Sequence, residues 1–345
     1  VTDERSLMRD ALKHTMGEAR LPEIRAEFGR RVQAAELIEV AHREGAAGRT
    51  FTTREMQGYE RDLIDRMKLS QGNREVLADG NVRQQTMEQH PHLSLSQRNA
   101  VDTVLTSRDQ MMALEGVAGA GKTTSLAAVR DAAVSAGYEV EGLAPTSRAA
   151  QKLGEAGMET HTLQHHLARG DRADDGQKRL YVIDESSMAS TKQMHTFIER
   201  LRGNDRVLFV GDTRQHEAVE AGRPYAQLQE AGLRTARLDE IIRQKDPALK
   251  EVVEQLARGE VRDAIGNLNE QGRVHEIGDR QERIAEIARE YVRSPENTLV
   301  VSPDNESRRE INQHIHRAMQ DPGQVKGEEH RVHVLYARQN ITGAD

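Results

Sequence analysis

The sequence predicts an α/β fold: a parallel sheet flanked by helices, preceded by a small, mostly helical N-terminal domain and followed by an incomplete second α/β domain. Short apolar runs alternate with amphipathic helical segments from about residue 93 to residue 235, as in strands joined by crossover helices. The residues before this region have a charged, helical pattern, and the alternation resumes after residue 236. We therefore divide the chain into residues 1–88, 89–235 and 236–345.

The N-terminal region is predicted to form charged helices with narrow apolar stripes. The stripes are Ile24, Phe28 and Val32 in one helix, and Ala35, Ile38 and Val40 in the next. Thr52 has the position of a helix N-cap, and Glu55 follows three residues later to close a capping box. The polar segment from Gln71 to Pro91 then predicts an irregular connection.

Four brief apolar runs predict strands of the sheet, because central parallel strands are buried on both faces. They are Met111–Leu114, Val140–Ala144, Leu180–Ile183 and Val207–Val210. Apolar residues at helical spacing predict a helix packed on this sheet: Met194, Phe197, Ile198 and Leu201. Beyond residue 236 we expect helices near 247–257 and 281–292, a strand at Thr298–Val301, and a strand-like stretch at Val332–Tyr336.

Composition excludes several classes of protein. Mean hydropathy is −0.74 and no long apolar run occurs, which argues against a membrane span. The absence of cysteine removes disulfides and thiolate chemistry, and it fits a cytoplasmic location. With 49 basic and 56 acidic residues the formal charge is −7, so any nucleic acid must bind in a local groove on an acidic body.

A phosphate-binding pattern, G-x-x-x-x-G-K-[ST], occurs at residues 116–123, between an apolar run and a helical stretch. The glycines allow backbone N–H groups to surround a phosphate, and the helix start adds positive potential. Lys122 would neutralise the β- and γ-phosphates, and Thr123 would hold Mg²⁺. We predict that the chain binds a nucleoside triphosphate through Gly116, Gly119, Ala120, Gly121, Lys122, Thr123 and Thr124.

Asp184 and Glu185 follow directly after the apolar run Leu180–Ile183. Asp184 would bind Mg²⁺, and Glu185 would orient and deprotonate an attacking water. A nucleotide kinase has no use for the second acid, and no N-K-x-D guanine-reading motif is visible. The pair therefore favours hydrolysis over kinase or GTPase chemistry.

A polar turn, Gly211-Asp212-Thr213-Arg214-Gln215, follows the next apolar run. Its position would let the amide of Gln215 contact both the γ-phosphate and the attacking water. Gln215 would then sense whether the nucleotide has been cleaved.

These sites resemble superfamily 1 helicases of the 5′-to-3′ branch (superfamily 1B, RecD-like). Further matching stretches are Leu95–Ala100, Ala144–Ala150, Thr160–Leu163 and Leu238–Gln244. The resemblance implies RecA-like domains, with ATP and Mg²⁺ as cofactors and single-stranded DNA as a partner. It implies that Gln97 reads the adenine edge and that Arg243 reaches the γ-phosphate as an arginine finger, so the implied catalytic residues are Lys122, Glu185, Gln215 and Arg243.

The same resemblance implies a DNA-binding segment and a second DNA contact. The segment contains Pro145, Thr146, Ser147 and Arg148, and the second contact is Thr162. From the residues alone, Arg148 and Arg214 either meet DNA phosphate or face solvent. His161 and His165 are four residues apart without an accompanying H-E-x-x-H pattern, so a polar surface role is favoured over metal binding.

The chain is most similar to the helicase part of conjugative relaxase-helicases, which implies other conjugation proteins as partners. Counterparts of helicase motifs V and VI and of a relaxase nuclease are not recognisable, so we expect a piece of a longer polypeptide that is not competent alone. Two hypotheses remain: a DNA-dependent ATPase motor, and a catalytically silent module that binds single-stranded DNA as a scaffold. The presence of every expected catalytic residue favours the motor.

Overall fold

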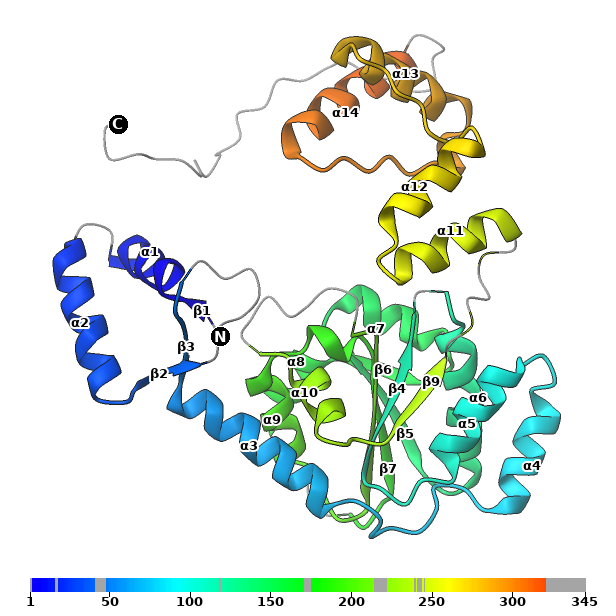
Figure 1. Ribbon diagram of the computed structural model, residues 1–345. Helices are drawn as coiled ribbons and strands as arrows, with labels where there is room; N and C mark the ends of the chain where they lie inside the picture. The colour runs from blue at the N-terminus through cyan, green and yellow to red at the C-terminus, as the bar shows by residue number, and fades with distance from the viewer. Residues whose placement is uncertain are drawn as a thin grey trace. The chain divides into compact units, whose positions relative to one another are not determined.

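A six-stranded parallel sheet with the order β6-β5-β7-β8-β4-β9 forms the centre of the fold (Figure 1). The computed structural model describes residues 2–15, 18–40, 48–117, 119–170, 175–213, 222–238, 240, 244 and 246–320. The strands are β4 (Met111–Gly116), β5 (Glu139–Ala144), β6 (Glu159–Thr162), β7 (Arg179–Ile183), β8 (Asp205–Gly211) and β9 (Thr235–Leu238). The predicted α/β fold is confirmed, and the four predicted strands are its four inner strands.

Helices cover both faces of this sheet. They are α5 (Leu95–Leu105), α6 (Lys122–Ser135), α7 (Ser147–Gly154), α8 (Leu163–Ala168), α9 (Thr191–Glu199) and α10 (Pro224–Glu230). Alternate strand residues point to opposite faces, so Met112 and Leu114 pack with α5 and α6, whereas Met111 and Ala113 pack with α9 and α10. The core is therefore two apolar layers, one on each side of the sheet.

The N-terminal part combines helices with a second, smaller sheet. The helices are α1 (Glu4–Thr15), α2 (Leu21–Gln33), α3 (Arg54–Leu69) and α4 (Gly80–Gln89), and the antiparallel strands are β1 (Thr2–Asp3), β2 (Leu37–Val40) and β3 (Thr50–Thr53). Phe28 of α2 packs edge-on against Phe51 of β3, with ring centroids 5.0 Å apart. This contact joins α2 to the small sheet.

Three expectations for this part were wrong. The stripe containing Ile38 and Val40 forms strand β2, because its backbone pairs with β3. Thr52 pairs with Ile38 inside that ladder, so the cap of α3 is Thr53, whose hydroxyl accepts a hydrogen bond from the N–H of Met56 at 3.1 Å. The segment expected to be irregular contains α4, which Asp79 caps by accepting from the N–H of Val82.

Helix α3 belongs to the core of the large sheet as well as to the N-terminal part. Leu63 and Met67 are 1% and 0% exposed, and they pack in one cluster with Met194, Phe197 and Ile198 of α9. A helix from the N-terminal region thus completes the apolar layer on this face.

The chain divides after Ala264 into two compact units. Helix α11 (Pro247–Ala257) precedes the division, α12 (Val261–Glu270) spans it, and the second unit contains α13 (Arg280–Arg293), the short 3-10 helix η2 (Pro295–Asn297) and α14 (Asn305–Gln320). The helices expected near 247–257 and 281–292 are confirmed. The domain boundaries at residues 88 and 235 stay predictions.

The strand expected at Thr298–Val301 is wrong. Residues 298–302 form no strand, and Leu299 and Val301 are 87% and 83% exposed. An apolar run becomes a strand only where a second strand supplies hydrogen bonds, and within the described residues 265–320 the regular elements are helices alone. The stretch Val332–Tyr336 lies outside the described residues.

Candidate functional site

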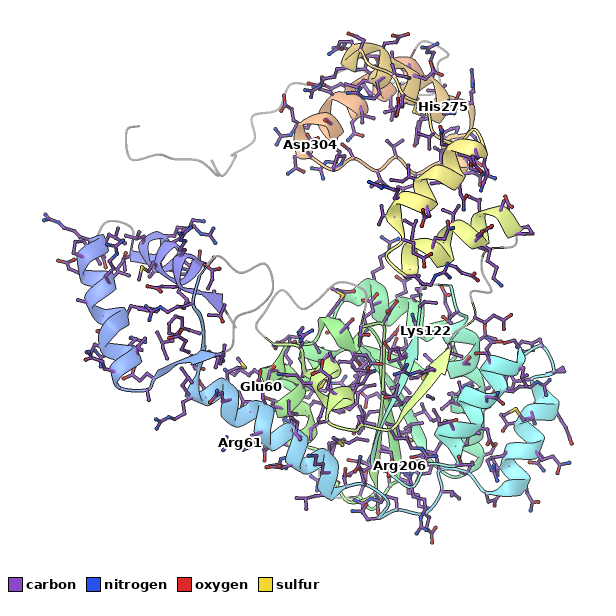
Figure 2. All side chains as sticks on the ribbon, viewed as in Figure 1. Glu60, Arg61, Lys122, Arg206, His275 and Asp304 are labelled. Atoms are coloured by element: carbon purple, nitrogen blue, oxygen red, sulfur yellow. The ribbon has the colours of Figure 1, made fainter. Side chains whose placement is uncertain are left out.

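The predicted site residues that the structure describes gather at the carboxyl ends of the parallel strands, or on α5 beside them. Parallel pairing brings these ends to one edge of the sheet, where α/β proteins bind ligands. Lys122 lies at this edge, and Arg206 lies at the opposite end of the sheet (Figure 2). The fold thus brings together residues from distant parts of the sequence.

The loop after β4 has the backbone geometry of a phosphate cradle. Gly119 and Gly121 hold φ angles of 83° and 76°, in the left-handed region that glycine adopts without strain. Gly121 is the N-cap of α6 and supplies no side-chain cap, so the helix start presents its first N–H groups toward an anion. A Cβ on Gly116 would lie 3.1 Å from Cβ of Leu238, so glycine permits the close approach of β9.

Lys122 folds back over the start of this loop. Its Nζ donates to the carbonyl oxygen of Gly116 at 2.6 Å and contacts that of Val117 at 3.4 Å. The ammonium therefore stands over the loop rather than in solvent. Together with the left-handed glycines, this arrangement fits a polyphosphate chain.

Gln97 contacts the same loop from α5. Its Nε2 donates to the carbonyl oxygen of Gly121 at 3.1 Å, and its Oε1 accepts from the N–H of Ser94 at 3.0 Å. The side chain is buried and both ends of its amide are engaged. Gln97 therefore supports the loop directly, while its role in reading adenine stays a prediction.

Asp184 and Glu185 leave β7 in different directions. The N–H of Asp184 donates to the carbonyl of Leu143 at 2.8 Å and prolongs the β5–β7 ladder. Glu185 then turns to φ 50° and ψ 39°, the left-handed region, which costs a residue with a Cβ about 1 kcal/mol. Asp184 is half-buried and Glu185 is exposed, so the turn separates a carboxylate inside the edge from one facing outward.

Burial raises the pKa of the Asp184 carboxyl. The hydrogen bond from the N–H of Glu185 and the charges of Lys122 and Lys152 offset that effect only in part. A carboxylate whose negative charge is only partly neutralised by nearby cationic side chains is a suitable ligand for a divalent cation. Asp184 could hold such a cation, and Thr123, the other residue expected to hold it, is half-buried in the first turn of α6.

The end of β8 is tied to the strand that leads into the phosphate loop. The hydroxyl of Thr213 donates to Oε1 of Glu115 at 2.5 Å. A cavity of about 520 Å³ opens beside this contact, with Gly116, Asp212 and Arg237 in its lining. Glu115 was not foreseen, since nothing in its spacing distinguishes it from any strand glutamate.

Gln215 and Arg243 lie outside the described residues, as does Arg214. Their expected roles as γ-phosphate sensor, arginine finger and DNA contact therefore stay predictions.

The expected DNA-binding residues line two neighbouring strand ends. Thr146 caps α7 by accepting from the N–H of Ala149 at 3.2 Å, and Thr162 caps α8 by accepting from the N–H of His165 at 3.1 Å. Ala144 and Thr162 are register partners in adjacent strands. Ser147 and Arg148 are exposed, and Pro145 is half-buried, so this edge presents polar and cationic groups to solvent.

A larger cavity, of about 710 Å³, contains none of the predicted residues. It lies between α8 and α9, and two of its arginines are engaged: Arg179 pairs with Asp175 at 2.7 Å, and Arg200 donates to the carbonyl of Leu167 at 2.9 Å. The volume of a cavity therefore does not by itself identify the candidate site in this fold.

Among the described residues, one trio of histidine and carboxylate side chains is close enough to share a metal ion: Asp62, His195 and Glu199. His161 and His165 are not part of such a trio, although their rings lie 5.2 Å apart. No described helix is long and apolar enough to cross a membrane.

A protein-family model described as an AAA domain matches residues 92–279. The match covers the phosphate loop, the acidic pair and the strand ends described above. It therefore includes the whole of the candidate site.

The curated relatives include conjugation proteins and a DNA helicase. The conjugal transfer protein TraA of Agrobacterium fabrum is 32% identical over 63% of this chain and 20% of its own length. The multifunctional conjugation protein TraI of Escherichia coli is 27% identical over 91% of this chain and 21% of its own. The ATP-dependent RecD2 DNA helicase of Deinococcus radiodurans is 34% identical over 48% of this chain and 24% of its own length. The predicted resemblance to conjugative and RecD-like helicases is confirmed, and the chain spans about a fifth of the length of the conjugation proteins.

Among solved structures, the Pif1 helicase of Candida albicans is 18% identical over 64% of this chain and 60% of its own, with a TM-score of 0.41.

Proposed function

The chain belongs to the AAA-domain family, and from that membership we propose that it is the ATP-dependent motor region of a conjugative DNA-transfer protein. It would bind single-stranded DNA and move along it in the 5′-to-3′ direction, the direction implied by its resemblance to superfamily 1B. One observation carries the proposal. The phosphate loop, the acidic pair and the two threonine-capped strand ends share a single edge of the sheet.

The nucleotide half of the proposal assigns one task to each residue. The backbone of Gly119–Gly121 and the start of α6 would hold the phosphates of ATP, and Lys122 would leave the carbonyl of Gly116 to neutralise them. Thr123 and Asp184 would hold Mg²⁺, which spreads the charge of the phosphates when bound. Glu185 would orient a water and accept its proton, because its carboxylate is the exposed member of the acidic pair.

The DNA half depends on a local surface, since the whole chain is acidic. Arg148 and the hydroxyls of Ser147 and Thr146 stand exposed at the start of α7. Phosphate contacts of this kind position a strand without reading its sequence. We therefore propose single-stranded DNA of any sequence as the substrate track, with other conjugation proteins as further partners.

Nucleotide binding is tested with a fluorescent ATP analogue and Mg²⁺ on the full chain. Lys122→Ala should weaken binding by about tenfold or more, because the phosphates lose a direct ion pair. Lys68→Ala, an exposed lysine on α3, is the matched control and should bind as the parent does. Equal loss in both variants, or no binding by the parent, would contradict the assignment.

DNA binding is tested by anisotropy with a labelled single strand over a range of salt. Arg148→Ala should weaken binding and reduce the salt slope by about one, the signature of one lost phosphate contact. Arg61→Ala, on the exposed side of α3 (Figure 2), should change neither. If single-stranded DNA raises ATP turnover by the full protein, the result supports the motor. If the protein binds DNA without turning over ATP, the result supports the scaffold instead.

A further inference from the structure

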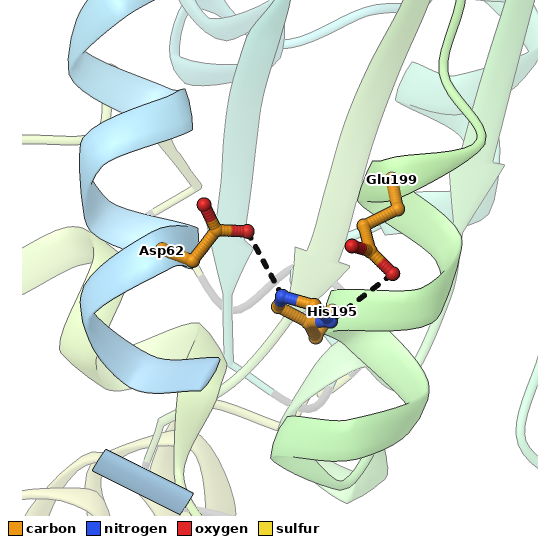
Figure 3. A group of neighbouring side chains, drawn as sticks. All are labelled: Asp62, His195 and Glu199. Atoms are coloured by element: carbon orange, nitrogen blue, oxygen red, sulfur yellow. Dashed lines mark hydrogen bonds and ion pairs between the residues drawn. The ribbon is translucent and has the colours of Figure 1, made fainter. Parts of the chain in front are cut away.

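A histidine and two carboxylates from two helices lie together on one face of the large sheet (Figure 3). His195 and Glu199 come from α9, and Asp62 comes from α3. One ligand atom of each residue lies within 4.8 Å of those of the other two. None of the three belongs to the phosphate loop, the acidic pair or the DNA-binding segment, so their role does not depend on the proposed function.

Regular helices hold all three side chains in place. His195 and Glu199 are four residues apart, so they project from the same face of α9. Asp62 directly precedes Leu63, which is buried in one cluster with Phe197 of α9. Groups on packed helices keep their relative positions better than groups on loops do. The trio is therefore positioned by the core beneath it.

The histidine offers a nitrogen beside a carboxylate oxygen. Its side chain is only 10% exposed, and its Nε2 is hydrogen-bonded to Oδ2 of Asp62 at 2.9 Å. Nδ1, to which the described residues supply no hydrogen bond, lies 3.4 Å from Oε2 of Glu199. An ionised carboxylate only accepts hydrogen bonds, and a neutral imidazole carries one lone pair. Nitrogen and carboxylate donors side by side are a ligand set that Zn²⁺ takes.

Arg66 of α3 shows that the two carboxylates converge on one cation. Its Nε donates to Oδ2 of Asp62 at 2.6 Å, and its Nη2 lies 3.8 Å from Oε1 of Glu199. The arginine side chain is 41% exposed, so the guanidinium can turn toward solvent when an ion takes its place. Two carboxylates and a neutral imidazole would then balance the charge of a divalent ion.

The trio has both access and room to close around an ion. Glu199 also lines the cavity of about 710 Å³ between α8 and α9. The side chains of Asp62 and Glu199 are 39% and 47% exposed, so they can rotate without disturbing the core. Ligand atoms of a tetrahedral ion with bonds of about 2.1 Å lie about 3.4 Å apart. Side-chain rotation can bring the three ligand atoms to that spacing, and water can take the fourth position.

We propose that Asp62, His195 and Glu199 form a Zn²⁺ site that ties α3 to α9. A ring nitrogen among the ligands favours Zn²⁺ over Mg²⁺ and Ca²⁺, which prefer oxygen ligands alone. The Mg²⁺ of the proposed ATP site therefore does not fill it. Arg66 holds the two carboxylates when the ion is absent, and the ion replaces that contact with a tighter link between the helices.

The test is calorimetric titration of Zn²⁺ into the full chain with excess Mg²⁺ and without ATP or DNA. The parent should bind one Zn²⁺ through this site. His195→Gln and Glu199→Gln each remove one ligand and should weaken this binding by about a hundredfold. His165→Gln removes an exposed histidine of α8 and should bind as the parent does.

A variant that gains affinity covers a failure of the ligand variants to fold. Arg66→Gln keeps all three ligands and removes the competing cation, so it should bind Zn²⁺ about fivefold more tightly than the parent. A cluster that serves only as an ion-pair network predicts no such gain.

Amide hydrogen exchange of residues 54–69 then shows whether the ion ties the helices together. Zn²⁺ at about a hundred times its Kd should raise the protection of α3 about a hundredfold in the parent, because opening of α3 must release the ion. The same Zn²⁺ affinity in the parent, His195→Gln and Arg66→Gln would overturn the proposal. Binding that leaves α3 unprotected would overturn it as well. Since ATP and DNA are absent, failure of the motor proposal leaves these results unchanged.

Discussion

The backbone N–H of Glu185 donates to Oδ1 of Asp184 at 2.9 Å, while Glu185 itself holds the left-handed φ of 50°. The two acids are therefore fixed in a single turn that directs one carboxylate inward and the other outward. Unfavourable backbone geometry of this kind persists where the surrounding structure enforces it, and it often marks a functional position.

The strain at Glu185 can be separated from its chemistry. Glu185→Gly and Glu185→Ala both remove the carboxylate, so both should lose ATP hydrolysis by about a hundredfold or more. Only glycine relieves the left-handed backbone, so Glu185→Gly should be about 1 kcal/mol more stable than Glu185→Ala. Denaturant unfolding without nucleotide measures the difference. Equal stability of the two variants would show that the turn is not strained.

Asp184 is expected to lower stability in the absence of a cation. Because burial raises its pKa, the folded chain holds the ionised carboxyl less well than the unfolded chain does. Stability is therefore lost as pH rises from the unfolded pKa through the folded one. Asp184→Asn should raise the Tm at pH 7 while abolishing Mg²⁺-dependent ATP hydrolysis. Asp65→Asn, exposed on α3, is the control and should leave both unchanged.

Two glycines allow the stability cost of steric crowding to be measured apart from the cost of a left-handed backbone. Gly222 and Gly232 hold similar φ angles, 111° and 103°. A Cβ on Gly222 would lie 1.8 Å from Oγ1 of Thr191, whereas one on Gly232 would meet nothing within 4 Å. Gly232→Ala should cost about 1 kcal/mol from its φ alone, and Gly222→Ala about 3 kcal/mol or more. Thermal unfolding measures both, and equal losses would refute the crowding at Thr191.

Arg206 fixes the end of the sheet opposite the candidate site. Its guanidinium is buried and donates to the carbonyl oxygens of Ser107 at 3.0 Å, Asp109 at 3.3 Å and Glu75. Arg206→Met would leave these carbonyls without a donor and should destabilise the chain by about 3 kcal/mol in denaturant unfolding. Arg234→Met removes an exposed arginine of similar length and should change stability by less than about 0.5 kcal/mol.

The sequence predicted the four inner strands because each is a continuous apolar run, and burial on both faces requires one. The outer strands β6 and β9 were not predicted as strands. Glu159–Thr162 is polar and Thr235–Leu238 is short and mixed. Edge strands have one neighbour and less need of an apolar signature, so pattern alone does not reveal them.

The small sheet of β1, β2 and β3 was missed for a related reason. Ala35 and Ile38 have helical spacing whereas Ile38 and Val40 have strand spacing, and only the pairing of Ile38 with Thr52 and of Val40 with Thr50 decides between them. Pairing between distant segments is not visible in local spacing. The N-cap of α3 is Thr53 rather than the expected Thr52, because Thr52 is held in the same strand pairing.

For the candidate site, the sequence indicated the residues but not the contacts between them. The phosphate-binding pattern located Lys122 and Thr123, and strand ends located Asp184 and Glu185. The contacts of Gln97 with Gly121 and of Thr213 with Glu115 depend on how the strands are ordered in space. His195 and Asp62 stand 133 residues apart, and no spacing rule connects them.

Helix α3 has a practical consequence for anyone who wishes to produce the ATP-binding portion by itself. A recombinant fragment that begins at residue 89 would lack Leu63 and Met67, and the apolar surfaces of Met194, Phe197 and Ile198 would face water. Such a surface promotes aggregation during expression. A fragment that begins at Thr53 retains the helix together with its capping hydroxyl, and we expect it to be the shorter piece that stays in solution.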